Sequence, residues 1–215
     1  MPHAPSEARN AKIESFLKAA EKGYVQQVEQ FLKDGMSVDT QSIDLETALM
    51  RASSHGKLEV VELLLKHDAD VHLTNQHGDT ALHEAFFVEG SQSEVVLALL
   101  RARADPNATN DRLRTPFFMV TQQLVGEGLS GEWGRGCAND MLQMLNYGAN
   151  WWVEDSRGQS PIGLMMDCLK EHPNWRVETL KAGTSEIWER AESEWSKNEL
   201  TLHMPEGKDG RVVKL

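Results

Sequence analysis

One phrase returns along most of this chain, and its period constrains the fold more than any other feature. The clearest copy reads GDTALHEA over residues 78–85. Equivalent positions lie 33, 33, 35 and 45 residues apart, at Glu14, Thr47, Thr80, Thr115 and Ser160. Such a period predicts a stack of similar units, each packed only against its neighbours. A stack of this kind presents one long surface for binding, not one deep pocket.

Each unit reads as two apolar helical runs separated by a break. In the second unit the runs are 48–53 and 58–65, and the segment 68–72 (DADVH) follows them. This order resembles the ankyrin repeat, whose pattern is T-P-L-H, two helices, G-A-D-V-N and a β-hairpin turn. The resemblance covers about residues 12–170. It implies an all-α solenoid of about five helix-turn-helix units joined by β-hairpin turns.

The register of the repeat predicts where the units and the ends of the stack lie. We expect one continuous ankyrin-repeat domain over 11–170, then a C-terminal helix and tail over 184–215. The expected units lie near 11–43, 44–76, 77–111, 112–156 and 157–183. The first unit is polar where an internal unit would be apolar, which suits an end cap.

The C-terminal segment carries its own helical pattern. Four apolar residues recur at helical spacing between about 185 and 198: Ile187, Trp188, Ala191 and Trp195. We favour a helix that caps the last unit over a helix that binds a partner.

The spacing also predicts where the chain departs from a regular repeat. The distance from the end of each second helix to the next unit is always 12 residues, so added residues fall between the two helices of a unit. The largest insertion is expected as a loop within 125–139.

The turns between units differ in one residue. Glycine holds the turn position at Gly78 and Gly158, whereas leucine holds it at Leu45 and Leu113. Because glycine suits a positive φ, we expect the two leucine turns to have another shape.

Composition argues against several classes of function. The chain has 40% apolar residues and no apolar run of about 18, so we expect no membrane-spanning helix. The N-terminal sequence is polar and lacks a secretory signal, which favours the cytoplasm. A net charge of −11 argues against binding nucleic acid and is compatible with a basic protein partner.

The reactive residue types form no recognisable site. Five histidines between His55 and His83 match no metal-ligand spacing, and the resemblance gives His83 a structural hydrogen bond to a neighbouring turn. Asn107 holds a position that is hydroxylated in some animal ankyrin proteins, although a turn-forming role is favoured. Cys137 and Cys168 are expected as free thiols in a reducing compartment. We expect no cofactor, metal or catalytic residue.

The resemblance also implies which residues meet a partner. Ankyrin stacks generally bind through the turn tips and the exposed side of the first helices, which together line a concave face. Transferred unit by unit, these positions are Ile43, Asp44, Glu46, His55, Gln76, His77, Asp79, Phe87, Val88, Asp111, Arg112, Arg114, Gln122 and Arg157. Charge along this strip changes from acidic at the first turn to basic at the third.

Aromatic and apolar residues at unusual places mark the individual features of this chain. Phe87 and Val88 stand at a solvent-facing position, unless the following insertion buries them. Trp133, in the expected loop, either contacts a partner or folds back onto the stack. Of Trp151 and Trp152, one should pack and one should face a partner, because consecutive extended residues point in opposite directions.

The sequence therefore favours a non-enzymatic protein-binding module, monomeric on its own. Within that class, we expect a stoichiometric inhibitor of one protein, of the immunity type that bacteria make against their own toxins. An adaptor or scaffold subunit of a larger complex is the alternative. A different class is an enzyme or redox protein that uses Cys137, whose thiol lies beside Arg135 in the glycine-rich insertion. A third class, beside the binding module and the enzyme, is a purely structural part of an oligomer.

Overall fold

The computed structural model describes residues 4–86, 92–126, 132–171 and 185–202. Within these ranges the chain forms helices and no strands, which confirms the all-α class. The helices are α1 (Ala4–Lys22), α2 (Val25–Lys33), α3 (Ala48–Ser54), α4 (Leu58–Lys66), α5 (Ala81–Glu84), α6 (Ser93–Arg101), α7 (Pro116–Gly126), α8 (Glu132–Asn146), α9 (Pro161–Glu171) and α11 (Ser185–Leu202).

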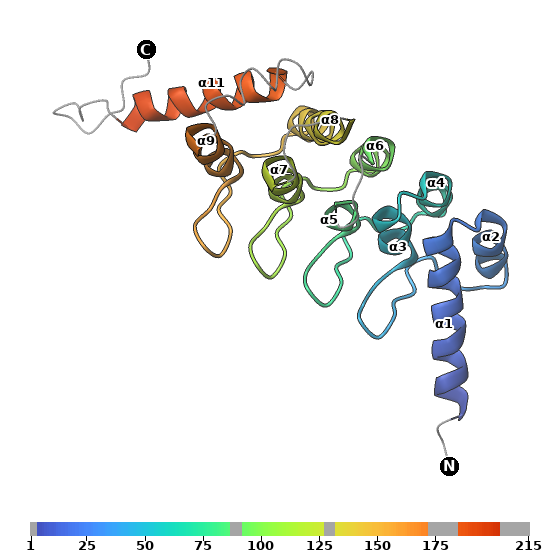
Figure 1. Cartoon of the computed structure of the whole chain (residues 1–215). Coiled ribbons are helices and arrows are strands. Elements are labelled where there is room, and N and C mark those ends of the chain that lie inside the picture. The colour runs from blue at the N-terminus through green and yellow to red at the C-terminus, as the bar shows by residue number, and fades with distance from the viewer. Residues whose placement is uncertain (1–3, 87–91, 127–131, 172–184, 203–215) are drawn as a thin grey trace.

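The helices stack in two layers (Figure 1). The inner layer contains α1, α3, α5, α7 and α9, and the outer layer contains α2, α4, α6 and α8. Hairpin-shaped loops project from the inner layer between successive units. Among the described helices, none is both long and apolar enough to cross a membrane.

The recurring phrase builds the inner core. The residue two places after each unit start is buried in every unit. These residues are Phe16, Leu49, Leu82, Phe117 and Ile162. Full burial of such a side chain stabilises the fold by about 1.5–3 kcal/mol. The residue at the unit start often caps the helix that follows. The hydroxyls of Thr47, Thr115 and Ser160 each accept a hydrogen bond from the backbone N–H three residues later in the chain, at 3.1–3.2 Å. The phrase therefore recurs because one position starts each inner helix and another fills the core.

The ends of the outer helices keep the predicted register. The residues that close them all have positive φ, between 59° and 88°, and they are Gly35, Asp68, Arg103 and Gly148. A left-handed residue is a common way to end a helix. The same residues mark the start of each constant 12-residue segment in the sequence.

Four hairpin turns, which we name fingers 1 to 4, share one hydrogen-bond pattern. They comprise residues 42–46, 75–79, 110–114 and 155–159. In each finger, the first residue donates its N–H to the carbonyl of the fifth at 2.8–3.1 Å, and the fourth donates to the first. The fourth residue has positive φ in all of them: 61° at Leu45, 76° at Gly78, 57° at Leu113 and 74° at Gly158. The expectation that the leucine turns differ in shape is therefore wrong.

The first residue of each finger explains this uniformity. Its side-chain oxygen accepts the N–H groups of the third and fifth residues at 2.8–3.2 Å. These residues are Ser42, Asn75, Asn110 and Asp155, all of types that commonly hold turns through their side chains. The side chain at the first position fixes the turn, so glycine at the fourth is favourable but not required.

The large insertion is helical over much of its length. The expected loop over 125–139 is wrong for 125–126, which belong to α7, and for 132–139, because α8 begins at Glu132. The helix buries Cys137, Ala138 and Met141 in the core. Asp140 accepts a hydrogen bond from the hydroxyl of Ser93 at the start of α6, which ties the longer helix to its neighbour. Burial raises the pKa of Asp140 to about 7.

The C-terminal helix α11 covers the last unit, where it packs against α9 and α8 (Figure 1). Ile187 and Ala191 are fully buried, which confirms the predicted capping face. The ring of Trp195 stacks on that of Trp152 with 5.9 Å between centroids, and Lys170 lies over Trp195 at 5.8 Å. The predicted helix therefore forms and continues to Leu202.

Candidate protein-binding site

The four fingers form a continuous ladder along one edge of the inner layer. The second residue of each later finger donates its N–H to the third residue of the finger before it. These bonds join Gln76 to Asp44, Asp111 to His77, and Ser156 to Arg112, at 2.9–3.0 Å. Because neighbouring tips are bonded to each other, the surface is organised before a partner arrives, and ordering it on binding costs little.

Side chains also join the fingers beneath their tips. The amide of Asn110 donates to the Asp79 carboxylate at 2.7 Å, and the Nε of Arg114 donates to Asp155 at 3.2 Å. Burial raises the pKa of Asp155, but the N–H groups of Arg157 and Gln159 and the Arg114 guanidinium outweigh that effect and lower it. Asp155 is therefore a buried anion whose partners are all supplied by the stack.

His83 connects the inner helix α5 to finger 3. The N–H of Thr80 donates to Nδ1 at 3.1 Å, so Nε2 carries the proton and donates to the Arg114 carbonyl at 2.9 Å. Burial lowers the pKa of His83, which favours the neutral ring that this network needs. The structural role predicted for His83 is confirmed. No cluster of three or more potential metal ligands occurs in the described ranges.

A hollow of about 250 Å³ lies between fingers 2 and 3. Its lining residues are His77, Asp79, Asn110, Asp111, Arg112, Arg114 and Met119. Five of these were predicted from the sequence as partner contacts, and the fold brings them together. Arg114, one of these residues, is held in place: its guanidinium lies 5.1 Å from the centre of the Phe118 ring and 3.4 Å from the Gln122 amide oxygen.

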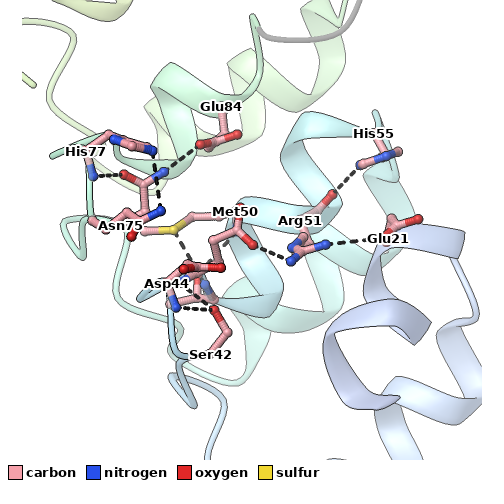
Figure 2. Close-up of polar contacts among 12 residues, drawn as sticks. Glu21, Ser42, Asp44, Met50, Arg51, His55, Asn75, His77 and Glu84 are labelled. Carbon is pink, nitrogen blue, oxygen red and sulfur yellow. Dashed lines mark hydrogen bonds and ion pairs between the residues drawn. The ribbon is translucent and has the colours of Figure 1, made fainter. Parts of the chain in front are cut away.

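Around finger 1, the charges pair within the stack (Figure 2). Arg51 forms ion pairs with Glu46 and, at 3.4 Å, with Glu21. The backbone carbonyl of Arg51 lies 3.1 Å from the His55 ring. Glu46 is therefore partly neutralised, whereas Ile43 at the tip is 89% exposed and Asp44 beside it is also exposed.

A buried carboxyl lies next to Asn75 of finger 2 (Figure 2). Glu84 accepts a hydrogen bond from the Asn75 amide at 2.8 Å. Burial and the nearby carboxylates of Asp79 and Glu46 raise its pKa to about 7, against an opposing effect of Arg51. The sequence carried no signal for this group, because its environment depends on residues from two successive units.

Two predicted contact residues are largely occupied by bonds within the stack. Asp79 is 3% exposed, because its carboxylate accepts the Asn110 amide inside the fold. The side chain of Arg114 is 12% exposed, since Asp155 and Phe118 hold it. The exposed members of the predicted set are Ile43, Asp44, His55, Gln76, His77, Asp111, Arg112, Gln122, Trp152 and Arg157.

Of the aromatic and apolar residues predicted at unusual places, the structure describes the side chains of some and not of others. Trp151 is buried against Phe117, edge to face, with 5.1 Å between ring centroids. Trp152 is 36% exposed, so the two residues do point in opposite directions, and a partner contact by Trp152 stays a prediction. Phe87 and Val88 lie outside the described residues. Trp133 belongs to α8, and its side chain is likewise outside the description.

Two exposed apolar residues of the fingers are not in the predicted set. Leu45 is 46% exposed and Leu113 is 52% exposed. Both leucines are visible in the sequence, but their departure from glycine predicts only a different turn shape and not a surface contact.

The thiols do not form a reactive site. Cys137 and Cys168 are both buried, and burial raises the pKa of Cys168 to about 11. Cys137 belongs to the core, with its sulfur 4.0 Å from the Gln123 amide oxygen. A buried thiol is inaccessible to a substrate, so the geometry does not support the redox alternative.

Comparison with known proteins agrees with the architecture. Residues 16–110 match the family model "Ankyrin repeats" in three copies. "Ankyrin repeat and SOCS box protein 16" of Mus musculus is 30% identical over 142 residues, which cover 63% of this chain and 29% of that protein. "Ankyrin repeat, SAM and basic leucine zipper domain-containing protein 1" of Ovis aries is 34% identical over 112 residues, 51% of this chain and 23% of that protein.

The "E3 ubiquitin-protein ligase mind-bomb" of Drosophila melanogaster is 33% identical over 88 residues, 34% of this chain and 7% of that protein. The chain thus spans less than a third of the length of these relatives. The segment that the family model matches contains the inner-core residues Phe16, Leu49 and Leu82, fingers 1 and 2, and the first residue of finger 3. Residues 16–110 are therefore built from ankyrin repeats, the units of a family of protein-interaction modules.

Proposed function

We propose that this chain is a non-enzymatic module that holds one protein partner along its fingers and blocks it stoichiometrically, as an immunity-type inhibitor does. The observation that carries the proposal is the hollow between fingers 2 and 3, lined by His77, Arg112 and other predicted contacts. As part of the same proposal, the module is monomeric on its own and acts in the cytoplasm.

The chemistry of the hollow suits a polar side chain of a protein. Both arginines line it: Arg112 is exposed, and the guanidinium of Arg114 is held by Asp155 and the Phe118 ring. Asp111 and His77 supply further polar groups around the opening. Arginine is common among the residues that dominate protein interfaces, particularly where the surrounding surface is already ordered.

The arrangement of the described helices favours inhibition. All of them belong to one stack, and the fingers form one continuous strip along it (Figure 1). A partner whose functional site lies against that strip is covered by it. Binding then blocks the partner without any chemistry by the module itself.

An adaptor role is the second candidate, and the relatives favour it. Their names combine ankyrin repeats with a SOCS box or with SAM and leucine zipper domains. In an adaptor, the fingers would recruit a partner that stays active.

Capture from native cells followed by titration tests the proposal. Wild-type protein should retain one partner that Arg112→Glu retains at least about tenfold less, while Arg101→Glu on α6 makes the same charge change away from the fingers and should retain it fully. If Arg112→Glu and wild type retain the same proteins equally, the proposed surface is wrong. With the purified partner, a blocker abolishes activity at one equivalent, whereas an adaptor leaves it unchanged.

A further inference from the structure

Two exposed leucines hold a backbone conformation that side chains rarely adopt. Leu45 and Leu113 have φ of 61° and 57°, and fingers 2 and 4 place glycine at the equivalent position. A bulky residue in the left-handed region is an outlier that requires an explanation. Both residues also keep about half of their surface in contact with solvent.

The fold does not require leucine at these positions. Each finger is closed by the side chain of its first residue and by backbone bonds, which glycine makes equally well in fingers 2 and 4. Neither leucine belongs to the buried core or to the partly buried residues packed against it. Glycine would relieve the strain and remove exposed apolar surface, so the leucine side chains serve something outside the fold.

The tip of finger 1 adds a further apolar residue. Ile43 is 89% exposed and stands two residues before Leu45. Apolar side chains therefore gather on alternate fingers, with Ile43 and Leu45 on finger 1 and Leu113 on finger 3. Exposed apolar residues rimmed by polar ones are typical of an interaction site.

The polar residues beside these leucines follow a charge gradient. The third residue of each finger is exposed, and in chain order these residues are Asp44, His77, Arg112 and Arg157. One structurally equivalent position thus changes from acidic at finger 1 to basic at fingers 3 and 4. A partner surface with the opposite gradient is attracted in one orientation and repelled in the reverse one.

We propose that Ile43, Leu45 and Leu113 are the apolar anchors of the partner interface, which deepens and rests on the proposed function. The partner is a different protein with two apolar pockets, on a surface that is basic opposite finger 1 and acidic opposite fingers 3 and 4. A second copy of this chain is a poorer occupant, because each copy carries a net charge of −11 and the two repel.

The strain makes a sharp test possible, because removing the anchors should not unfold the protein. Leu45→Gly and Leu113→Gly should each weaken binding to the purified partner about tenfold or more in calorimetric titration, as expected for a leucine buried at an interface. Their thermal unfolding midpoints should be equal to or above that of wild type. Tyr147→Ser removes an apolar residue of similar exposure, 44%, from the end of α8 and should change the affinity less than about twofold.

The charge gradient is tested on the same complex. Asp44→Lys and Arg157→Glu should each weaken binding, and added salt should reduce the wild-type affinity more than that of either variant. If either substitution strengthens binding, the assigned orientation of the partner is wrong.

Other outcomes separate this inference from the proposed function. If both glycine variants bind like wild type while Arg112→Glu does not, the fingers bind but the leucines are not anchors. If no protein is retained by wild type, both proposals fail. If sedimentation shows that wild type dimerises and the glycine variants do not, the occupant is a second copy and the inference of a different partner is wrong.

Discussion

Fingers 1 and 3 have the same hydrogen-bond pattern as fingers 2 and 4, although leucine replaces glycine at the fourth position. The difference shows where the turn is encoded. In all four fingers, the side chain of the first residue accepts two N–H groups, and this residue is Ser, Asn, Asn or Asp in chain order. Glycine lowers the conformational energy of the turn but does not define its shape.

The two glycine fingers also differ from each other. A Cβ added to Gly78 would lie 3.0 Å from the backbone nitrogen of Asp111 and 3.1 Å from the Cα of Asn110. A Cβ added to Gly158 would meet nothing within 4 Å. Glycine at position 78 is therefore needed for the close approach of finger 3 and is also favoured by its φ, whereas at position 158 only φ favours it.

The largest expected effect comes from removing the residue that holds a finger. Asn110→Ala deletes the acceptor for the N–H groups of Arg112 and Arg114 and the donor to Asp79. We expect the free energy of unfolding to fall by about 3 kcal/mol, because buried partners lose their bonds. Ser42→Ala, which removes two 3.2 Å bonds and no tie to a second finger, should cost about 1 kcal/mol in the same urea titration. Equal costs would contradict the role assigned to the tie between fingers.

Filling the two glycine positions should separate strain from collision. Gly78→Leu combines a left-handed side chain with a clash against backbone atoms, so we expect a loss of about 3 kcal/mol. Gly158→Leu carries the backbone strain alone and should cost about 1 kcal/mol. Urea unfolding of both variants measures the difference. If Gly158→Leu is as damaging as Gly78→Leu, close approach is not what distinguishes the two fingers.

Finger 2 should also make the free energy of unfolding depend on pH in a way that finger 1 does not, because its Asn75 is bonded to the buried Glu84. Its pKa rises from the ordinary value of 4.5 to about 7 on folding, so between these values the folded chain binds more protons than the unfolded chain. The free energy of unfolding therefore decreases as pH rises through this window, by about 2 kcal/mol between about pH 5 and 8.

Glu84→Gln should remove that part of the pH dependence. The wild-type minus variant difference isolates Glu84, because His83, whose lowered pKa has the opposite effect, and Asp140 are present in both proteins. Urea titrations at several pH values measure it. A difference that does not change with pH would show that Glu84 keeps an ordinary pKa in the fold.

The sequence predicted what repeats and missed what depends on distant neighbours. Burial of Leu82 and Ile162 followed from the period, because equivalent positions face the same neighbours in every unit. The part of α8 over 132–139 was not predicted, because Gly134 and Gly136 lower helix propensity, whereas burial of its other face stabilises the helix. Asp79 was placed on the surface because its partner Asn110 is 31 residues away.

The smallest expected effect is a gain in stability at the leucine fingers. Leu45→Gly and Leu113→Gly should each raise the free energy of unfolding by about 0.5–1 kcal/mol, because relief of the left-handed strain exceeds the added entropy of glycine in the unfolded chain. Leu45→Ala and Leu113→Ala keep a Cβ, and therefore the strain, so they should give no such gain in thermal or urea unfolding. If alanine stabilises as much as glycine, the energy comes from exposed apolar surface, and fingers 1 and 3 are not strained relative to fingers 2 and 4.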